Sequence, residues 1–300
     1  MGVSARRIGD APIIQRFSDQ RMGANVNGPS LVKTPAWLSG RLGVYHLYFA
    51  HHLGSYIRLA YADDLAGPWH IHAPGVLDIS EVPFLYEHIA SPDVHIDEAR
   101  REFRMYFHGV SDPAPWESPT QSSCVATSAN GLGFQVRDQI LGAPYFRVWQ
   151  AGDWTYAIAL GGELWRSRDG MTAFEKGPKL RGLPSGVRHP AILQRAGKTW
   201  VAWSAIGDCP ERILIAQVDA SGTWDTWSVP EPQELLKPDF PYEGSALPLI
   251  PSQPDLAPAP VHQLRDPAFY TEDDRVYLLY SVAGEAGIGL AELTFDDQPA

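Results

Sequence analysis

The sequence is poor in cysteine and in basic residues, and it lacks long apolar runs. Its two cysteines, Cys124 and Cys209, lie far apart in the chain, so we expect free thiols in a reducing compartment rather than a disulfide framework. Lysine and arginine number 24 against 35 acidic residues, a net charge of −11, and they form no basic run. Phosphate binding needs a basic face, so a nucleic-acid partner is not expected.

Two further absences concern membranes and export. No stretch approaches the roughly 18 consecutive apolar residues that a membrane-spanning helix needs. The first residues, MGVSARRIGDAPIIQ, contain no apolar segment of the kind found in a secretion signal. We therefore expect a cytoplasmic protein without a membrane partner.

What the sequence does contain is a repeated pattern of short strands. Five prolines open similar segments: Pro35, Pro92, Pro144, Pro190 and Pro267. Most are followed by a turn and then by an aromatic strand such as FRMYFHG, KTWVAWSA or RVYLLYSV. Self-similarity at a period of about 40–50 residues, with strand-like units only, is typical of a β-propeller. The alternative is a β-sandwich whose prolines recur by coincidence.

The pattern predicts an all-β, five-bladed β-propeller with four-stranded antiparallel blades, forming a single domain over residues 1–300. The blades are expected at about 28–80, 85–138, 141–180, 186–229 and 262–296. The last copy lacks an outer strand, and an open ring would leave unpaired edges. We therefore expect residues 11–17 to supply that strand. The proline-rich segment 230–261 is interpreted as an insertion folded over one end of the channel.

The residues beside the five prolines are candidates for a site. The first strand of each propeller blade lines the central channel, so the residues that open these strands converge. They include Lys33, Asp93, Tyr145, Arg188, His189, Arg265 and Asp266. Charges near the centre of a fold are costly unless they are paired or hydrated, so a cluster of them indicates function. The structural alternative is that Arg265 and Asp266 form salt bridges that tie blades together.

Several short motifs resemble a known group of enzymes. SPDV at 91–94, the dipeptide Glu243-Gly244, RDP at 265–267 and the strand YLLYS at 277–281 resemble the five-bladed propeller glycoside hydrolases of family 43, with families 32 and 117 as relatives. The resemblance implies Asp93 as the residue that tunes the pKa of the acid, Glu243 as the general acid and Asp266 as a transition-state stabiliser.

The resemblance fails at the general base of the family, an Asp just before the proline that opens blade one. Thr34 stands there, and the nearby turn offers Asn27. An inverting pair of carboxyl groups is separated by about 6.5–9.5 Å and a retaining pair by about 5–5.5 Å. Asp93, Glu243 and Asp266 are the candidates for such a pair, with Asp266 in the role of the base.

The histidines add a second set of candidates. Of the ten, six fall at strand ends or beside the motifs above: His51, His52, His95, His108, His189 and His262. A histidine can act as an acid near pH 7, and family 117 is similar in using one; histidines with a carboxylate can also hold a metal ion in the channel. His189 is the first choice because it precedes its proline as Asp266 does. For each histidine the alternative is a hydrogen-bonded channel residue.

The expected function is that of a glycoside hydrolase-like enzyme, acting on a small sugar or oligosaccharide in a pocket at the channel mouth. The catalytic candidates are Asp93, Glu243, Asp266 and His189. The substrate-binding candidates are Arg188, Arg265, His51, His52, His95, His108, Trp116 and Lys33, with Trp116 as a stacking surface for sugar rings. The alternatives are a metal-assisted hydrolase or lyase on the same scaffold and a non-catalytic carbohydrate-binding propeller.

Overall fold

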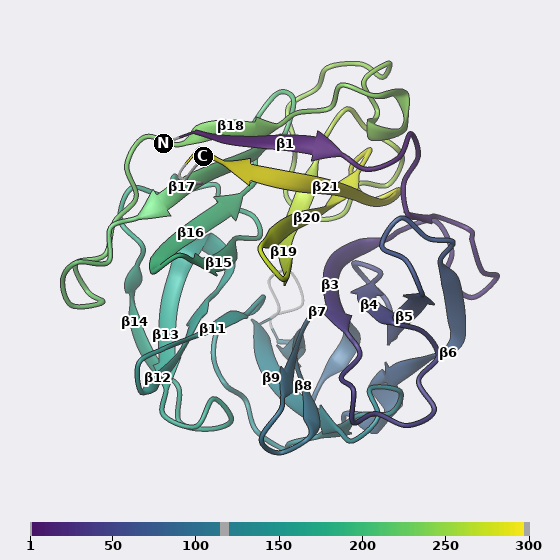
Figure 1. The fold of residues 1–300 in the computed structure, drawn as a ribbon, viewed down its shortest axis with the longest axis vertical. Helices are drawn as coiled ribbons and strands as arrows, with labels where there is room; N and C mark the ends of the chain where they lie inside the picture. The colour runs from purple at the N-terminus through teal and green to yellow at the C-terminus, as the bar shows by residue number, and fades with distance from the viewer. Residues whose placement is uncertain (1, 115–119, 297–300) are drawn as a thin grey trace.

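The structure is a computed structural model that describes residues 2–114 and 120–296. It consists of five antiparallel sheets arranged in a ring (Figure 1). Blade one contains β3 (Asn27–Lys33), β4 (Tyr45–Ala50), β5 (Tyr56–Ala62) and β6 (His70–Asp78). Blade two contains β7 (Tyr86–Asp97), β8 (Glu102–Asp112), β9 (Thr120–Ser128) and β10 (Gln135–Val136). Blade three contains β11 (Arg147–Ala151), β12 (Trp154–Ile158), β13 (Glu163–Ser167) and β14 (Glu175–Lys179).

The last two blades complete the ring. Blade four contains β15 (Ala191–Arg195), β16 (Lys198–Trp203), β17 (Ile213–Val218) and β18 (Gln233–Leu236). Blade five contains β19 (Arg265–Glu272), β20 (Arg275–Val282), β21 (Gly287–Phe295), β1 (Val3–Arg7) and β2 (Ile14–Gln15). Three short 3-10 turns lie between strands: Ile79–Glu81, Leu160–Gly162 and Pro241–Glu243. The prediction of a five-bladed β-propeller with four-stranded antiparallel blades is confirmed.

An N-terminal strand closes blade five, as predicted, but it is not the predicted segment. β1 pairs with β21 over its whole length, from Val3 opposite Phe295 to Arg7 opposite Ala291, so the first and last strands lie side by side (Figure 1). Of the predicted residues 11–17, only the two residues of β2 pair with β21. Val3 packs into a core cluster that contains Phe295. This burial explains why residues 3–7, and not residues 11–17, form the strand that closes blade five.

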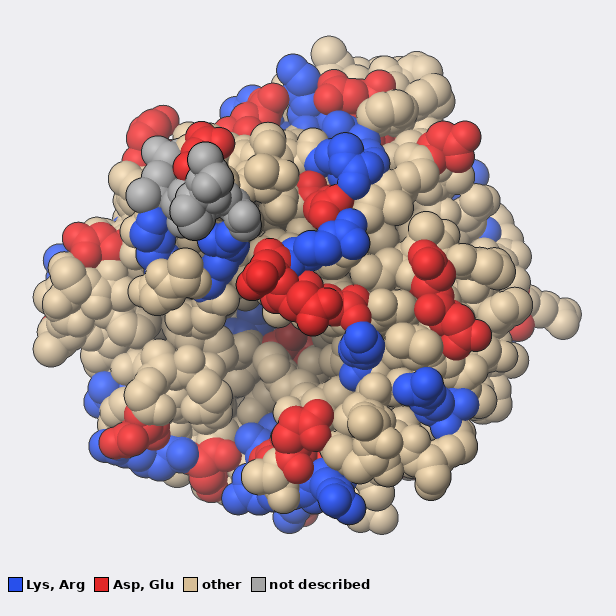
Figure 2. Space-filling view, in the orientation of Figure 1, with Lys and Arg blue, Asp and Glu red and all other residues tan. Residues whose placement is uncertain are grey.

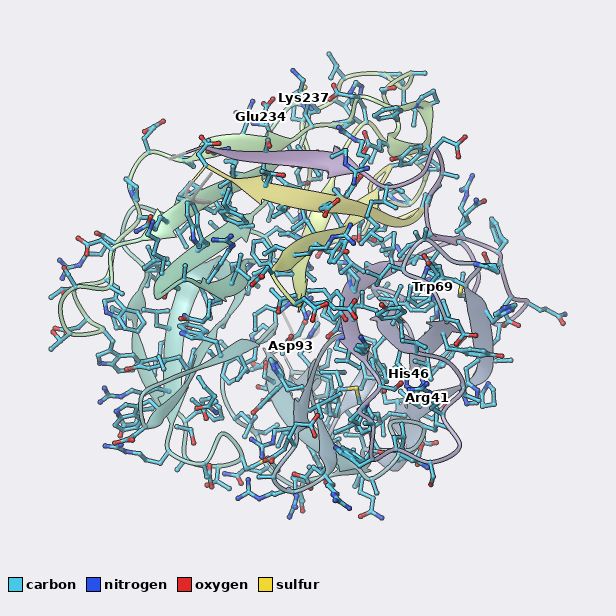
Figure 3. All side chains as sticks on the ribbon, in the orientation of Figure 1. Arg41, His46, Trp69, Asp93, Glu234 and Lys237 are labelled. Atoms are coloured by element: carbon cyan, nitrogen blue, oxygen red, sulfur yellow. The ribbon has the colours of Figure 1, made fainter. Side chains whose placement is uncertain are left out.

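The predicted insertion 230–261 also contains a strand. β18, Gln233–Leu236, pairs with β17 as the outer strand of blade four, and Glu234 and Lys237 mark it at the rim of the ring in Figure 3. Leu235 and Leu236 are buried against the core of blades four and five. The prolines on either side, Pro232 and Pro238, limit the strand to an edge position, where a missing N–H costs nothing.

The inner strands of three blades contain the same backbone irregularity. Pairing shifts register between Asn27 and Ser30, between Ala90 and Asp93, and between Arg265 and Ala268. Within each shift, the residue just before the proline has positive φ: 58° at Gly28, 49° at Ser91 and 50° at Asp266.

Blade one therefore opens at Pro29, and the assignment to Pro35 was wrong. Lys33 is the last residue of β3, at the far end of that strand. Thr34 follows it, with its hydroxyl donating to the carbonyl oxygens of Gly43 and Val44. Gly28 holds the place before the proline because a Cβ there would lie 2.8 Å from Cα of Ser91.

Over residues 2–114 and 120–296, no helix is both long enough and apolar enough to cross a membrane.

Candidate active site

A group of buried side chains lies where the inner strands begin. We call it the strand-start cluster and define it by His88, His108, Tyr145, His189, Asp266 and Glu285. The starts of the inner strands of blades two to five supply His88, Tyr145, His189 and Asp266. His108 comes from the end of β8, which pairs with the start of β7, and Glu285 comes from the turn before β21. All of them except Tyr145, which is half-buried, are at most 4% exposed.

The centre of the cluster is a hydrogen bond between His189 and Asp266. Nδ1 of His189 contacts Oδ1 of Asp266, and the hydroxyl of Ser281 donates to Oδ2 at 3.0 Å. Burial would raise the pKa of Asp266, but His189, Arg188 and Arg265 outweigh it and hold that pKa below its usual range. The carboxylate is therefore ionised and can only accept, so Nδ1 of His189 carries the proton.

This arrangement leaves Nε2 of His189 as a basic atom. Burial lowers the pKa of His189 even though Asp266 acts in the opposite direction, so the ring is neutral at neutral pH. An imidazole that donates through Nδ1 to a carboxylate presents the lone pair of Nε2 for proton transfer. The positive φ of Asp266 adds to the case for function, because strained backbone is concentrated at sites that use it.

Tyr145 lies between two imidazole rings. Its ring centroid is 3.8 Å from that of His108 and 4.0 Å from that of His189. It also has positive φ, 66°, at the start of blade three. Burial, then Asp266 and Glu285, raise the pKa of Tyr145, so its hydroxyl stays protonated and can donate.

Two arginines and two glutamates form a chain of ion pairs around this centre. Arg188 binds Glu211 through Nε at 2.8 Å, and Arg265 contacts both Glu211 and Glu285 at 3.2 Å. Glu285 also contacts Nδ1 of His52 at 3.2 Å, which links blade five to blade one. Burial would raise the pKa of Glu285, but His52 and Arg265 hold it below its usual range. The predicted binding residues Arg188 and Arg265 are thus occupied by carboxylates.

Asp93 and His95 lie at a different level of the channel. They line a cavity of about 610 Å³ together with Lys33, Arg147 and Glu272. His95 Nε2 is 2.9 Å from Oδ2 of Asp93. Figure 3 shows Asp93 near the centre of the ring, and Figure 2 shows a hollow there with acidic residues beside it. Lys33 is paired with Glu272 at this end, opposite to its predicted place among the strand starts.

Glu243 is not in the channel. It has no exposed surface. Arg7 binds it at 2.7 Å, Tyr280 donates to it at 2.9 Å, and the backbone N–H of Asp239 donates at 2.8 Å. All of these groups belong to blade five or to the segment that covers its outer side. Both oxygens of Glu243 are occupied by donors outside the strand-start cluster, so the geometry does not support Glu243 as the acid of this site.

The structure thus brings together some of the predicted residues and separates others. His189, Asp266, His108, His52, Arg188 and Arg265 meet at the strand starts. His51 lies next to them in the turn after β4, where its Nδ1 accepts from the N–H of Leu53 at 3.0 Å. Asp93, His95 and Lys33 belong to the cavity, and Glu243 belongs to neither. Trp116 lies outside the described residues.

Three important residues, His88, Glu211 and Glu285, were missed from the sequence, and Tyr145 was named there only as a residue beside a repeat proline. Tyr145 follows Pro144 in the third repeat, so its position beside a repeat proline was a signal. His88 stands three residues before Ser91, just ahead of the SPDV motif. Glu211 and Glu285 lie in turns before the third strands of their blades, where no repeat position marks them.

The metal alternative has no support among the described residues, which contain no group of three or more His, Cys, Asp or Glu side chains placed to hold an ion.

Comparisons with solved structures define the class of fold. The chain resembles a family 43 glycoside hydrolase from Xanthomonas citri solved with xylotriose, at 14% identity and a TM-score of 0.62, covering 95% of this chain and 90% of that one. It also resembles an α-L-arabinanase from Cellvibrio cellulosa, at 14% identity and a TM-score of 0.60, covering 91% and 93%. An exo-1,5-α-L-arabinanase from a bovine ruminal metagenomic library matches at 12% identity and a TM-score of 0.61, covering 94% and 97%. The chain has the five-bladed propeller fold of these glycoside hydrolases, as the motifs indicated.

The sequence itself places the chain in a narrower group. It is 36% identical over 300 residues to the uncharacterized protein R118 of Acanthamoeba polyphaga mimivirus, covering 90% of this chain and 83% of that protein. The chain belongs to the same family as that protein. No protein-family model matches the sequence.

Proposed function

We propose that the protein is a glycosidase-like enzyme that cleaves a glycosidic bond of a small sugar or oligosaccharide at the strand-start cluster. The observation that carries the proposal is the buried His189–Asp266 pair, with the ring of Tyr145 in contact with the histidine. The pair supplies a proton-transfer group, and Tyr145 supplies a hydroxyl donor beside it. The fold neighbours are sugar-cleaving enzymes, one of them solved with xylotriose, which favours a carbohydrate substrate.

The groups proposed to transfer protons in this site are not the pair of carboxyl groups that most glycoside hydrolases use. Glu211 and Glu285 are held by arginines, and Asp266 is held by His189. An acid must hold a proton at working pH, and the pKa values of Asp266 and Glu285 are both below their usual range. We therefore assign proton acceptance to the free Nε2 of His189, the orientation of that ring to Asp266 and proton donation to the hydroxyl of Tyr145, whose pKa burial raises.

The test is turnover of xylose and arabinose nitrophenyl glycosides and of xylotriose by His189→Gln. Loss of a general acid–base group typically costs about 10²–10⁴-fold in rate, and we expect a loss of that size. His95→Gln breaks the His95–Asp93 pair. It therefore tests whether the chemistry takes place in the cavity at the other end of the channel. His46→Gln is the neutral control, because His46 is buried in blade one away from the centre of the ring (Figure 3).

Three outcomes decide the assignment. Loss in His189→Gln with near-normal turnover in the other two supports it. Loss in His95→Gln instead would move the chemistry to the 610 Å³ cavity. Unchanged turnover in His189→Gln would overturn the proposal.

A second candidate is a propeller that binds sugars without cleaving them. The pairing of Glu211 and Glu285 with arginines favours it, because neither carboxylate is left free for catalysis. Sugar binding by a wild-type protein that turns over none of the substrates would support this candidate.

A further inference from the structure

Buried polar atoms without a partner gather on one side of the strand-start cluster. Both ring nitrogens of His108 lack a hydrogen-bond partner among the described residues, and so do Nδ1 of His88, Oγ of Ser91 and Oδ1 of Asn27. His108 is 0% exposed and the other three are at most 4% exposed. All four residues belong to blades one and two, whereas the His189–Asp266 pair belongs to blades four and five.

Their positions in the sheet bring three of them close together. His108 of β8 stands opposite Ala90 of β7, next to Ser91, and the rings of His88 and His108 are 5.9 Å apart. Asn27 opens β3 beside Gly28, whose Cα carries no side chain and lies against Ser91. Tyr145 joins this side to the other, because its ring contacts both His108 and His189.

Leaving these atoms unpaired is expensive. A buried donor or acceptor without a partner costs about 1–3 kcal/mol, and a neutral imidazole always has one donor and one acceptor to satisfy. Buried polar groups are paired in the great majority of cases, so a group of exceptions requires an explanation. A ligand that both donates and accepts hydrogen bonds would satisfy all of them.

We propose that His108, with His88, Ser91 and Asn27, forms the recognition side of the site and binds the hydroxyl groups of an uncharged sugar unit. This rests on the proposed function, and it adds which residues select the substrate and what charge the substrate has. A hydroxyl group can donate to one ring nitrogen and accept from another, as these atoms require.

The charges around this side explain why the sugar is uncharged. Burial lowers the pKa of His88 to about 4 and that of His108 well below its usual value, so both rings are neutral at neutral pH. Arg188 and Arg265 are held by Glu211 and Glu285. An anionic group such as a carboxylate or a phosphate would therefore find no free cation among these residues.

The experiment measures binding and stability rather than turnover. Wild type and His108→Phe are titrated by calorimetry with D-xylose, L-arabinose and xylotriose as neutral probes and with D-glucuronate and glucose 6-phosphate as anionic probes. Phenylalanine keeps a ring against Tyr145 and removes both nitrogens. We expect neutral probes to bind about 10–100-fold more weakly to the variant. We expect its melting temperature to stay the same or to rise, because unpaired polar atoms have been removed.

A matched control and a second variant keep the result interpretable. His46→Phe makes the same change at a buried histidine, also with an unpartnered Nε2, outside the site, and should leave sugar affinity unchanged. Ser91→Ala removes one hydroxyl with little effect on packing and should weaken the same probes. It replaces the test should His108→Phe fail to fold.

The outcomes separate this inference from the proposed function. Unchanged affinity in His108→Phe or, in its place, Ser91→Ala, or tighter binding of the anionic probes, overturns the inference even if His189→Gln abolishes turnover. Binding that depends on His108 in a protein without glycosidase activity supports the inference and overturns hydrolysis. Failure of every neutral probe to bind the wild type overturns both.

Discussion

The guanidinium of Arg147 donates a hydrogen bond of 3.3 Å to the carbonyl oxygen of Pro29 and so spans the channel from blade three to blade one. It also donates to the carbonyl oxygen of Pro92 at 2.6 Å and contacts Asp93 at 3.5 Å. The cavity begins at the residues that follow these prolines, Ser30 and Asp93. Arg147 therefore lies between the strand-start cluster and the cavity and separates them.

We predict that Arg147→Met destabilises the ring. Removing one partner of a buried ion pair costs up to about 3–5 kcal/mol. His95 still contacts Asp93 at 2.9 Å, so we expect a loss toward the lower end of that range, with the carbonyl oxygens of Pro29 and Pro92 also losing a donor. Urea unfolding of variant and wild type measures this cost. Arg100→Met is the control, because Arg100 is exposed and its pair with Asp97 at 2.9 Å belongs to the surface class worth about 0–1 kcal/mol. Equal losses in the two variants would contradict the view that Arg147 holds the channel together.

Glu243 is predicted to matter for stability and not for turnover. Glu243→Gln weakens a buried pair with Arg7 of the closing strand, so it should lower the free energy of unfolding by up to about 3–5 kcal/mol. Arg7→Met should have a similar effect. Arg6→Met, on the same strand but with an exposed side chain paired to Glu292, should cost about 0–1 kcal/mol. A fall in the turnover of folded Glu243→Gln would restore Glu243 as a catalytic candidate.

The buried histidines predict a loss of stability in mild acid. Burial lowers the pKa of His46 and His88 to about 4 and that of His108 further, from an ordinary value of 6.5. Below pH 6.5 the unfolded chain therefore binds protons that the folded chain does not, and stability falls as the pH falls. Each such group contributes up to about 1.4 kcal/mol per pH unit between pH 6.5 and 4.

Chemical unfolding at pH 7, 6 and 5 measures this slope. His108→Phe removes one of these groups, so its stability should fall less steeply with pH than that of wild type. A wild-type stability that stays flat between pH 7 and 5, or equal slopes in the two proteins, would contradict the assignment of these rings as buried and neutral.

The sequence by itself determined the ring of five blades. The alternation of apolar residues and the turns between strands are local properties, and five copies of them allow only a few closed arrangements. It also determined that His189 and Asp266 belong together, because both stand directly before a repeat proline at the start of an inner strand. The assignment failed in blade one, where the repeat is least clear. Pro35 was taken as the proline that opens the inner strand instead of Pro29, so Lys33 and Thr34 were also placed at the wrong end of that strand.

Only the tertiary structure decided what each charged residue does. Glu243 matches a short motif, but its neighbours Arg7 and Tyr280 come from distant parts of the chain and enclose it. Glu211 and Glu285 lie in ordinary turns, and they matter because folding brings Arg188, Arg265 and His52 to them. The pairing of charges depends on distances across the channel between different blades, and these contacts leave no periodic pattern in the sequence.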